Sequence, residues 1–194
     1  MTGLYALKPW YAQRLAPVVV ALEHARVTPN QLSCAGVVFA GAAAAALALL
    51  PIGPVTGVLV AALLAARLAC ANMDGTLARR RPEDPTGGVS NEIGDRAADL
   101  AMLSGFVPFL GWPTAAVMLA ATLPSWSSLA VAAQGGGRSN GGPLGKTERC
   151  ALVVVAAITG WVAALAVVLA FGSAVTALVR LRDGRALLRT EAAR

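Results

Sequence analysis

Charged residues, histidine and cysteine are scarce in this chain of 194 residues. Charged residues make up 13% of the sequence, against roughly 25% in a soluble domain, and one residue is a histidine. The three cysteines all lie in apolar segments, which excludes a disulfide framework and leaves no His/Cys cluster for zinc. Intrinsic disorder is excluded as well, because the apolar content is high.

Hydrophobic residues are abundant instead, at 57% of the chain, and the mean hydropathy is +0.65. The net charge is +6, but the basic residues stand mostly between or beside apolar runs. This distribution is typical of a membrane protein that follows the positive-inside rule. We therefore expect an integral membrane protein whose partner is the lipid bilayer, and no binding of nucleic acid.

Apolar stretches predict six spanning helices, at residues 33–50, 55–78, 88–110, 113–133, 147–160 and 161–182. Most of them approach the ~20 residues that cross a bilayer. No charge interrupts the chain between Arg149 and Arg180, so a reversal is expected near Thr159 and Gly160. A single kinked helix in that region would leave five spans.

Loop charge favours six spans over five. The connections near residues 51–55, 111–113 and 159–160 carry no charge, whereas residues 79–84, 138–149 and 180–194 are rich in Arg or Lys. Six spans put all three basic segments on one side, which the positive-inside rule places in the cytoplasm. With five spans the C-terminal arginines would face outward.

The predicted fold is therefore an all-α polytopic membrane helix bundle that forms one domain over residues 1–194. Residues 1–30 are expected to form an amphipathic interfacial helix, because charged residues interrupt their apolar run. Residues 31–183 form the transmembrane bundle, and residues 184–194 form a cytoplasmic tail.

Four of the ten acidic residues fall within or at the ends of the second and third predicted spans: Asp74, Glu92, Asp95 and Asp99. A charged side chain at the centre of a bilayer costs roughly 2.5–3.5 kcal/mol, so the four need a shared partner. At about 100° per residue, the three acidic residues of the third span and Asn91 form one polar stripe. Hard oxygen ligands of this kind suit Mg²⁺ or Mn²⁺.

Small and basic residues accompany this stripe on the second span. One helix face carries Arg67, Ala71, Asp74, Gly75 and Ala78. The small residues leave room for a ligand or for close helix approach. Three arginines, at positions 79, 80 and 81, follow at the predicted cytoplasmic end and are suited to phosphate oxygens. The alternative is that these arginines only anchor the helix at the membrane surface.

The segment from Asp74 to Arg79, followed by seven residues and Gly87, resembles the D-x2-D-G-x2-A-R signature of the CDP-alcohol phosphotransferases, which continues with G-x3-D-x3-D. Residues 28–33 look like that family's entry to its first span, and residues 142–149 resemble its basic loop before helix five. The resemblance covers roughly residues 25–185.

This resemblance implies a six-helix enzyme of the cell's inner membrane, usually a homodimer, with its active site facing the cytoplasm. In that family an alcohol hydroxyl attacks the phosphorus that bears the lipid of a CDP-linked donor, commonly CDP-diacylglycerol, and CMP leaves. Two divalent ions, Mg²⁺ or Mn²⁺, would neutralise the pyrophosphate, while a carboxylate takes the hydroxyl proton. The alcohol acceptor is a polar head group whose identity stays open.

The signature is incomplete in this chain. Alignment places Ala71 and Asn91 at the first and third aspartate positions, so Asp74 and Asp95 are the two that remain. Glu92 and Asp99 restore the count of four carboxylates, and the pattern is similar to a variant with an N-E-x2-D-x3-D third helix.

By the resemblance, Asp74 and Asp95 are expected to bind metal. Glu92 and Asp99 are our own candidates for replacement ligands, with Asn91 as a neutral amide oxygen donor, and the family pattern itself does not give these roles. Asp95 is the expected general base and Asp99 its rival. Residues expected to bind the nucleotide, the acceptor head group or a phosphate are Gly75, Ala78, Arg79, Gly87, Lys146 and Arg149. The alternative for the last two is that they are loop charges on the cytoplasmic side.

Three functions remain open. The first is a phosphotransferase that uses a CDP-activated lipid. The second is a catalytically impaired relative that binds nucleotide or metal, suggested by Ala71 and Asn91. The third is a cation-coupled transporter, because carboxylates inside a membrane also mark ion paths. Transport does not explain the spacing of Gly75, Ala78 and Arg79 or the basic loop.

Overall fold

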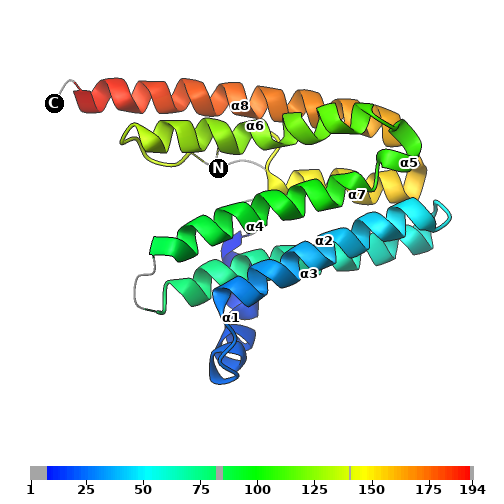
Figure 1. The fold of residues 1–194 in the computed structure, drawn as a ribbon, viewed down its shortest axis with the longest axis horizontal. Helices are drawn as coiled ribbons and strands as arrows, with labels where there is room; N and C mark the ends of the chain where they lie inside the picture. The colour runs from blue at the N-terminus through cyan, green and yellow to red at the C-terminus, as the bar shows by residue number, and fades with distance from the viewer. Residues whose placement is uncertain (1–7, 82–84, 140, 193–194) are drawn as a thin grey trace.

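The structure is a computed structural model in which residues 8–81, 85–139 and 141–192 are described. This part of the chain is all-helical and contains no strand. Figure 1 shows its eight helices. They are α1 (Lys8–His24), α2 (Pro29–Leu49), α3 (Pro54–Ala78), α4 (Pro85–Ser104), α5 (Val107–Leu110), α6 (Pro113–Ala133), α7 (Lys146–Thr159) and α8 (Val162–Ala192). The all-α prediction is confirmed.

Four of these helices, α2, α3, α6 and α8, are long and apolar enough to cross a membrane. They agree with the expectation of an integral membrane protein. The third and fifth predicted spans are present as α4 and α7, but α4 carries several charged residues and α7 has 14 residues. A helix of that length extends about 21 Å, short of the ~30 Å hydrocarbon core. The count of six spans therefore stays a prediction.

The chain reverses between α7 and α8. Helix α7 ends at Thr159, Gly160 adopts φ +75°, and α8 begins at Val162. Glycine suits this position because it has no Cβ and therefore adopts a left-handed backbone conformation at little energetic cost. Figure 1 shows the two helices running in opposite directions. The predicted reversal is confirmed, and the alternative of one kinked helix is wrong.

The start of α2 explains why the sequence around residue 28 folds as it does. Pro29 occupies the first turn, where its missing N–H costs nothing. The Gln31 backbone N–H donates to Thr28 Oγ1 at 3.2 Å, and the Thr28 backbone N–H donates to Gln31 Oε1 at 2.8 Å. This reciprocal capping satisfies two backbone donors that the helix leaves without partners. The motif therefore fixes the direction in which α2 enters the bundle.

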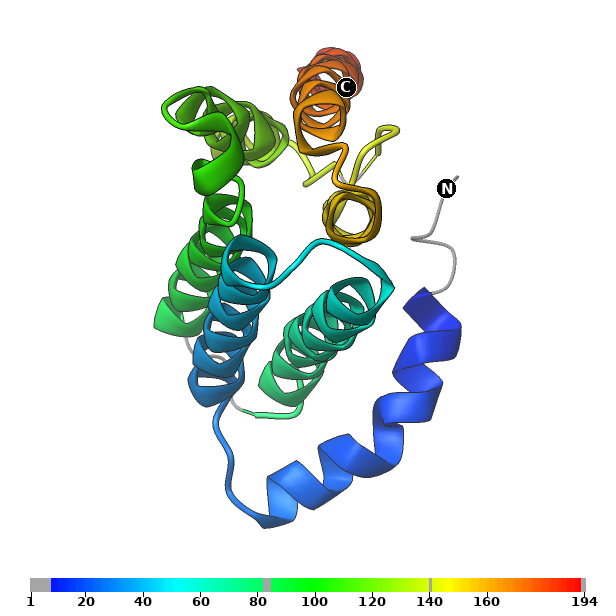
Figure 2. The same ribbon diagram turned by 90° about the vertical axis from the view of Figure 1, so that its right-hand side faces the viewer.

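The helices pack in two groups that α4 and α7 connect. Helix α2 packs against α3 and α4, and α6 packs against α8 (Figures 1 and 2). Between the groups, α7 contacts both α3 and α8, and α4 contacts α6. The core includes Leu64, Met102, Phe106 and Val153, all fully or nearly fully buried. Small residues bring α2 especially close to the C-terminal end of α4, since a Cβ on Gly105, the residue that follows α4, would lie 2.9 Å from the backbone of Ala44.

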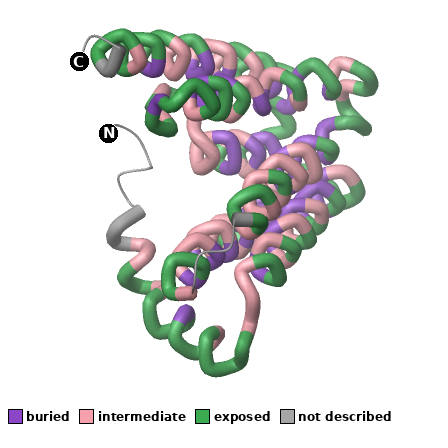
Figure 3. The backbone as a smooth tube through the Cα atoms, turned by 60° about the vertical axis from the view of Figure 1, so that its left-hand side comes forward, coloured by how far each residue is buried: buried purple, intermediate pink, exposed green. Residues whose placement is uncertain are grey.

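Exposed residues cover the outer faces of the bundle, while buried ones follow the lines where helices meet (Figure 3). Many exposed side chains are large and apolar, among them Val38, Val58, Val167 and Phe171. On a soluble protein such a surface would be a liability, whereas lipid can cover it.

Helix α1 lies beside α3, and polar contacts link it to α3 and to the segment that follows α3. The Tyr11 hydroxyl donates to the Ala65 carbonyl at 3.2 Å, and Arg80 pairs with Glu23 at 3.0 Å. The structure thus places a helix over residues 8–24 of the predicted interfacial segment, and residues 1–7 lie outside the described part. Its amphipathic and interfacial character stays a prediction.

The connections sort to the two ends of the bundle as the loop charges predicted. The C-terminal ends of α3, α6 and α8 and the N-terminal end of α4 lie toward one end, at the left in Figure 1. The α2–α3 and α7–α8 turns lie at the other. The helix ends that lead into the three basic segments therefore lie toward one end of the molecule, and which side of the membrane this end faces stays a prediction.

Candidate functional site

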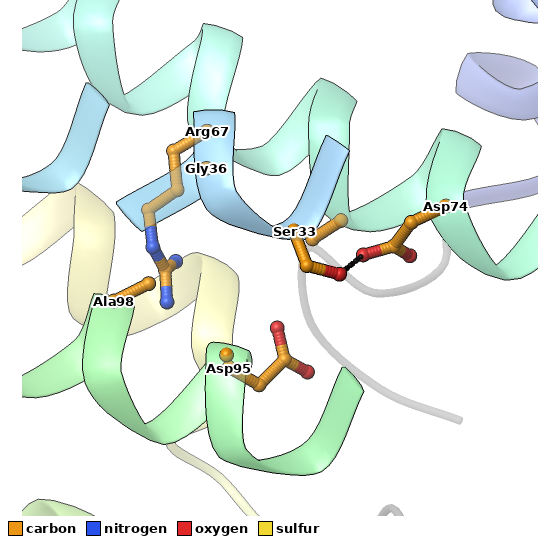
Figure 4. A pocket seen from close by; sticks show the side chains of 8 residues that line it. Ser33, Gly36, Arg67, Asp74, Asp95 and Ala98 are labelled. Atoms are coloured by element: carbon orange, nitrogen blue, oxygen red, sulfur yellow. Dashed lines mark hydrogen bonds between the residues drawn. The ribbon is translucent and has the colours of Figure 1, made fainter. Parts of the chain in front are cut away.

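A small cavity of about 10 Å³ lies where α2, α3 and α4 meet. Ser33 borders it from α2, Arg67 and Asp74 from α3, and Asp95 from α4 (Figure 4). Ala71, at the position of the first signature aspartate, lies on the same wall. The predicted approach of the two motif helices is thus present: Asp74 and Asp95 reach one cavity from facing helices.

Asp74 is held by neutral donors. Its side chain is 3% exposed, and the Ser33 hydroxyl donates to Oδ2 at 2.9 Å. The backbone N–H of Gly75 donates to Oδ1 at 2.5 Å. None of the ion pairs found within the described ranges involves Asp74. A buried carboxylate without a cationic partner is costly, and a bound cation would remove that cost.

Asp95 lies nearer to solvent and has a cationic partner. The Lys146 ammonium, from the first turn of α7, donates to Asp95 Oδ1, and Arg96 Nη2 lies 3.8 Å from Oδ2. About a quarter of each side chain in the Asp95–Lys146 pair is exposed. The basic loop identified in the sequence therefore reaches the cavity through Lys146.

Asp99 lies one helical turn farther along α4 and is fully buried. Arg67 Nη2 donates to Asp99 Oδ1, and Arg149 Nη2 donates to Oδ2 at 2.7 Å. Arg67 Nη1 also donates to the Cys150 sulfur at 3.3 Å. We call Arg67, Asp99 and Arg149 the buried cluster; it joins α3, α4 and α7. Asp99 and Arg149 therefore bind each other in the structure, and neither borders the cavity.

The remaining predicted ligands lie off the cavity. Glu92 pairs with Arg138 and, at 3.6 Å, with Arg96. The Asn91 carboxamide oxygen is buried and finds no hydrogen-bond partner among the described groups. Within the described residues, no three His, Cys, Asp or Glu side chains lie close enough together to hold a metal. Of the five predicted ligands, the cavity thus gathers Asp74 and Asp95.

The nucleotide-binding candidates lie at the end of α3 and the start of α4. Gly75 and Gly87 are partly buried, and Ala78 is exposed. Arg79 is exposed, and its guanidinium donates to Thr76 Oγ1 at 3.2 Å. This side chain stays on the helix that carries Asp74 and can turn toward a ligand.

The next two arginines bind the segment that leads into α2. Arg80 pairs with Glu23 of α1, and Arg81 Nη2 donates to the Val27 carbonyl at 2.8 Å. Both arginines are therefore bound within the protein, and the alternative that they anchor the helix at the membrane surface stays a prediction.

Arg67 is the site residue to which sequence reasoning gave no role, although it was placed on the same face as Asp74. A signal was present, because an arginine in the middle of an apolar span is expensive and marks a functional or structural partner. The sequence alone does not identify that partner, since Asp74, Asp95 and Asp99 are all candidates.

The cavity's donors fit one divalent metal ion. Asp74, Asp95 and Ser33 offer hard oxygen atoms, and Mg²⁺ commonly uses one or two carboxylates together with substrate phosphates. Mn²⁺ accepts the same oxygen donors. The other carboxylates of the site are bound to arginines.

Solved structures of the phosphatidylinositol phosphate synthase PgsA1 of Mycobacterium tuberculosis share this fold. The structure with CDP-DAG bound is 22% identical to this chain, with a TM-score of 0.67 over 87% of this chain and 92% of PgsA1. The complex with manganese and citrate is 23% identical, with a TM-score of 0.64 over 87% of each chain. The apo form is 22% identical, with a TM-score of 0.64 over 86% of this chain and 94% of PgsA1.

No family model and no curated protein sequence matches the chain. The likeness to PgsA1 therefore concerns the fold, which extends over nearly all of both chains. The resemblance stated from the motif is confirmed at this level: the chain has the fold of PgsA1, a CDP-alcohol phosphotransferase.

Proposed function

We propose that this protein transfers a phosphatidyl or similar substituted phosphate group from a CDP-linked donor, such as CDP-diacylglycerol, to a polar alcohol, with release of CMP. The observation that carries the proposal is the approach of Asp74 and Asp95 to one cavity inside the PgsA1 fold. One solved structure of PgsA1 has CDP-DAG bound, and another is a complex with manganese and citrate. Both ligands suit the acidic and basic residues found here.

In the proposed reaction the acceptor hydroxyl attacks the phosphorus that bears the lipid, the bond from that phosphorus to the CMP oxygen breaks, and CMP leaves. A carboxylate takes the hydroxyl proton. Asp95 is our choice, because it borders the cavity and is partly exposed. Asp99 remains the rival base, although both of its oxygens accept hydrogen bonds from arginines.

Positive charge at the site suits the pyrophosphate of the donor. Lys146 reaches Asp95 from α7, and Arg79 stands one turn beyond Asp74 on α3. Guanidinium and ammonium groups bind phosphate oxygens through charge-assisted hydrogen bonds. Gly75 and Ala78 keep this face of α3 small, which leaves room for the nucleotide.

A divalent ion, Mg²⁺ or Mn²⁺, would be held by Asp74 and Asp95 and would stabilise the negative charge that develops on the phosphate oxygens. We propose that this site faces the cytoplasm of the inner membrane, because the helix ends that lead into the basic segments lie toward its end of the bundle. A homodimer is proposed from the family resemblance.

The test is release of CMP by the purified chain in detergent micelles with CDP-diacylglycerol, Mg²⁺ or Mn²⁺ and a panel of acceptors. The panel contains glycerol phosphate, inositol phosphate and serine, so that it also identifies the acceptor. We expect CMP release that depends on both the metal and one acceptor. Folded protein that releases no CMP with any acceptor would contradict the proposal.

A catalytically impaired relative is the second candidate. Ala71 and Asn91 leave the signature two aspartates short, and one of the remaining two is paired with Lys146. Such a protein would bind the donor without turning it over. Calorimetric binding of CDP-diacylglycerol, with no CMP released in the same preparation, would favour this function over the first.

A further inference from the structure

The charges of the site limit how many metal ions it can hold. Four carboxylates lie in and around it: Asp74, Glu92, Asp95 and Asp99. Five cationic side chains contact or adjoin them: Arg67, Arg96, Arg138, Lys146 and Arg149. Within the described residues, Glu92, Asp95 and Asp99 each have a cationic partner, whereas Asp74 has none. A second divalent ion would add two positive charges where charge is poorly screened.

The oxygen ligands impose the same limit. The two carboxylates that border the cavity, Asp74 and Asp95, can balance one divalent ion. Ala71 contributes a methyl group where the signature has a carboxylate, so this wall lacks the ligand that a neighbouring ion would use.

Arg67 stands one helical turn from Ala71 and borders the same cavity. It is 1% exposed, and Asp99 and Cys150 accept hydrogen bonds from its two terminal nitrogens. Its Nε–H is buried and has no partner among the described groups. Figure 4 shows the side chain descending from α3 toward Ala98, with Asp95 facing it from below. A buried donor of this kind favours an anionic ligand.

We propose that the cavity binds a single divalent ion between Asp74 and Asp95, and that the Arg67 guanidinium supplies the neighbouring positive charge as a fixed side chain. Its Nε–H then binds an oxygen of the donor phosphate. This inference rests on the proposed function, because a CDP-linked donor provides that phosphate. Asp99 holds the guanidinium in place and acts as a positioning residue.

The first experiment counts ions. Purified full-length chain in detergent micelles is titrated with Mn²⁺, alone and with CDP, and bound Mn²⁺ is measured by electron paramagnetic resonance. We expect one tightly bound ion per chain for the unaltered protein. A count of two, or no tight binding in either condition, overturns the inference. The control is Arg185→Met, which removes an exposed arginine of α8 and should leave the count at one.

Variants then test Arg67 directly. Ala71→Asp alone should still bind one ion, because the new carboxylate lies one turn from Arg67 and can pair with it. Combining Ala71→Asp with Arg67→Met removes that partner and should raise the count to two. A second ion in Ala71→Asp alone overturns the inference. Should the double variant fail to fold, the counts for the unaltered chain and for Ala71→Asp still decide.

A conservative variant separates phosphate binding from folding. Arg67→Lys keeps a positive charge but loses the Nε–H and the planar geometry, so CDP affinity should fall about tenfold while the Mn²⁺ count stays at one. Unchanged CDP affinity overturns the proposed phosphate contact. Neither readout needs turnover. One ion without CMP release contradicts the proposed function, whereas two ions with CMP release contradict this inference.

Discussion

Asp95 and Asp99 lie one turn apart on α4, yet their surroundings differ. Asp95 borders the cavity, is partly exposed and pairs with a lysine that solvent also reaches. Asp99 is fully buried between two buried arginines. The contrast extends to their partners on α7, because Lys146 and Arg149 are three residues apart and contact the two carboxylates in the same order. Two cations about one turn apart on α7 thus pair with two carboxylates one turn apart on α4.

Under the proposed function, the carboxylates on one face of α4 have two different tasks. A carboxylate that takes a proton or binds an ion needs access to ligands, which the cavity gives Asp95. A carboxylate that joins three helices needs permanent partners, which Arg67 and Arg149 give Asp99. Substitutions at the two positions should therefore fail in different assays.

The largest effect is expected from Asp95→Asn on turnover. The amide cannot accept the hydroxyl proton, so CMP release should fall at least about 100-fold while the helical content and the unfolding midpoint stay nearly unchanged. Assays of CMP release and of thermal unfolding in the same detergent check the expected loss of turnover and the expected retention of stability. The control is Asp183→Asn, the same chemical change at an exposed position of α8, which should be fully active. Asp95→Asn with near-normal turnover would make Asp99 the better base.

Asp99→Asn should instead lower stability. Loss of the charge leaves two buried guanidiniums facing a neutral amide, which costs about 3–5 kcal/mol when a buried ion pair is broken. Unfolding titrations with sodium dodecyl sulfate in mixed micelles measure the free energy of unfolding. Asp95→Asn serves as the matched comparison and should lose less than about 1 kcal/mol, because its pair is partly exposed. Equal losses at the two positions would contradict the division of tasks.

Much of the fold could be predicted from local patterns. Apolar runs located α2, α3, α4, α6, α7 and α8, and the uncharged stretch at Thr159 and Gly160 located a turn. Residues 28–33, which resemble the family's entry to its first span, marked the start of α2. These signals are local in the sequence. The length of α7 was less accessible, because its apolar run continues toward α8 after the short turn at Gly160.

The site was predictable in part. The motif identified Asp74 and Asp95, which do reach one cavity, and the basic loop identified Lys146. The angular position of residues around the helix placed Asp99 and Glu92 on the same stripe. It contains no information on how deeply each side chain is buried or on which arginine of another helix pairs with it. Arg149 contacts Asp99 across 50 positions of the sequence, and a single sequence does not reveal such a pairing.

Moving α4 without changing a charge would sharpen the comparison. Gly105→Ala places a Cβ 2.9 Å from the Ala44 backbone, so α2 and α4 must separate at a cost of about 1–3 kcal/mol. Gly41→Ala is the matched control, because its Cβ meets nothing within 4 Å and alanine favours a helix by about 1 kcal/mol. The free energy of unfolding, measured in detergent, should fall for Gly105→Ala and rise for Gly41→Ala. Equal changes in the two variants would rule out close helix packing as the reason for the effect of Gly105→Ala.

The smallest effect is expected where an ion pair lies at the surface. Arg80 and Glu23 join the segment that follows α3 to α1, and their side chains are 41% and 43% exposed. A double-mutant cycle of Arg80→Ala and Glu23→Ala should give a coupling of about 0.2–1 kcal/mol, since water and salt screen such pairs. The same cycle on Arg149 and Asp99 should give a larger coupling, because both side chains are buried. A coupling at Arg80 and Glu23 that matched the one at Arg149 and Asp99 would mean that burial does not set the strength of ion pairs in this bundle, and the distinction between the cavity and the buried cluster would lose its physical basis.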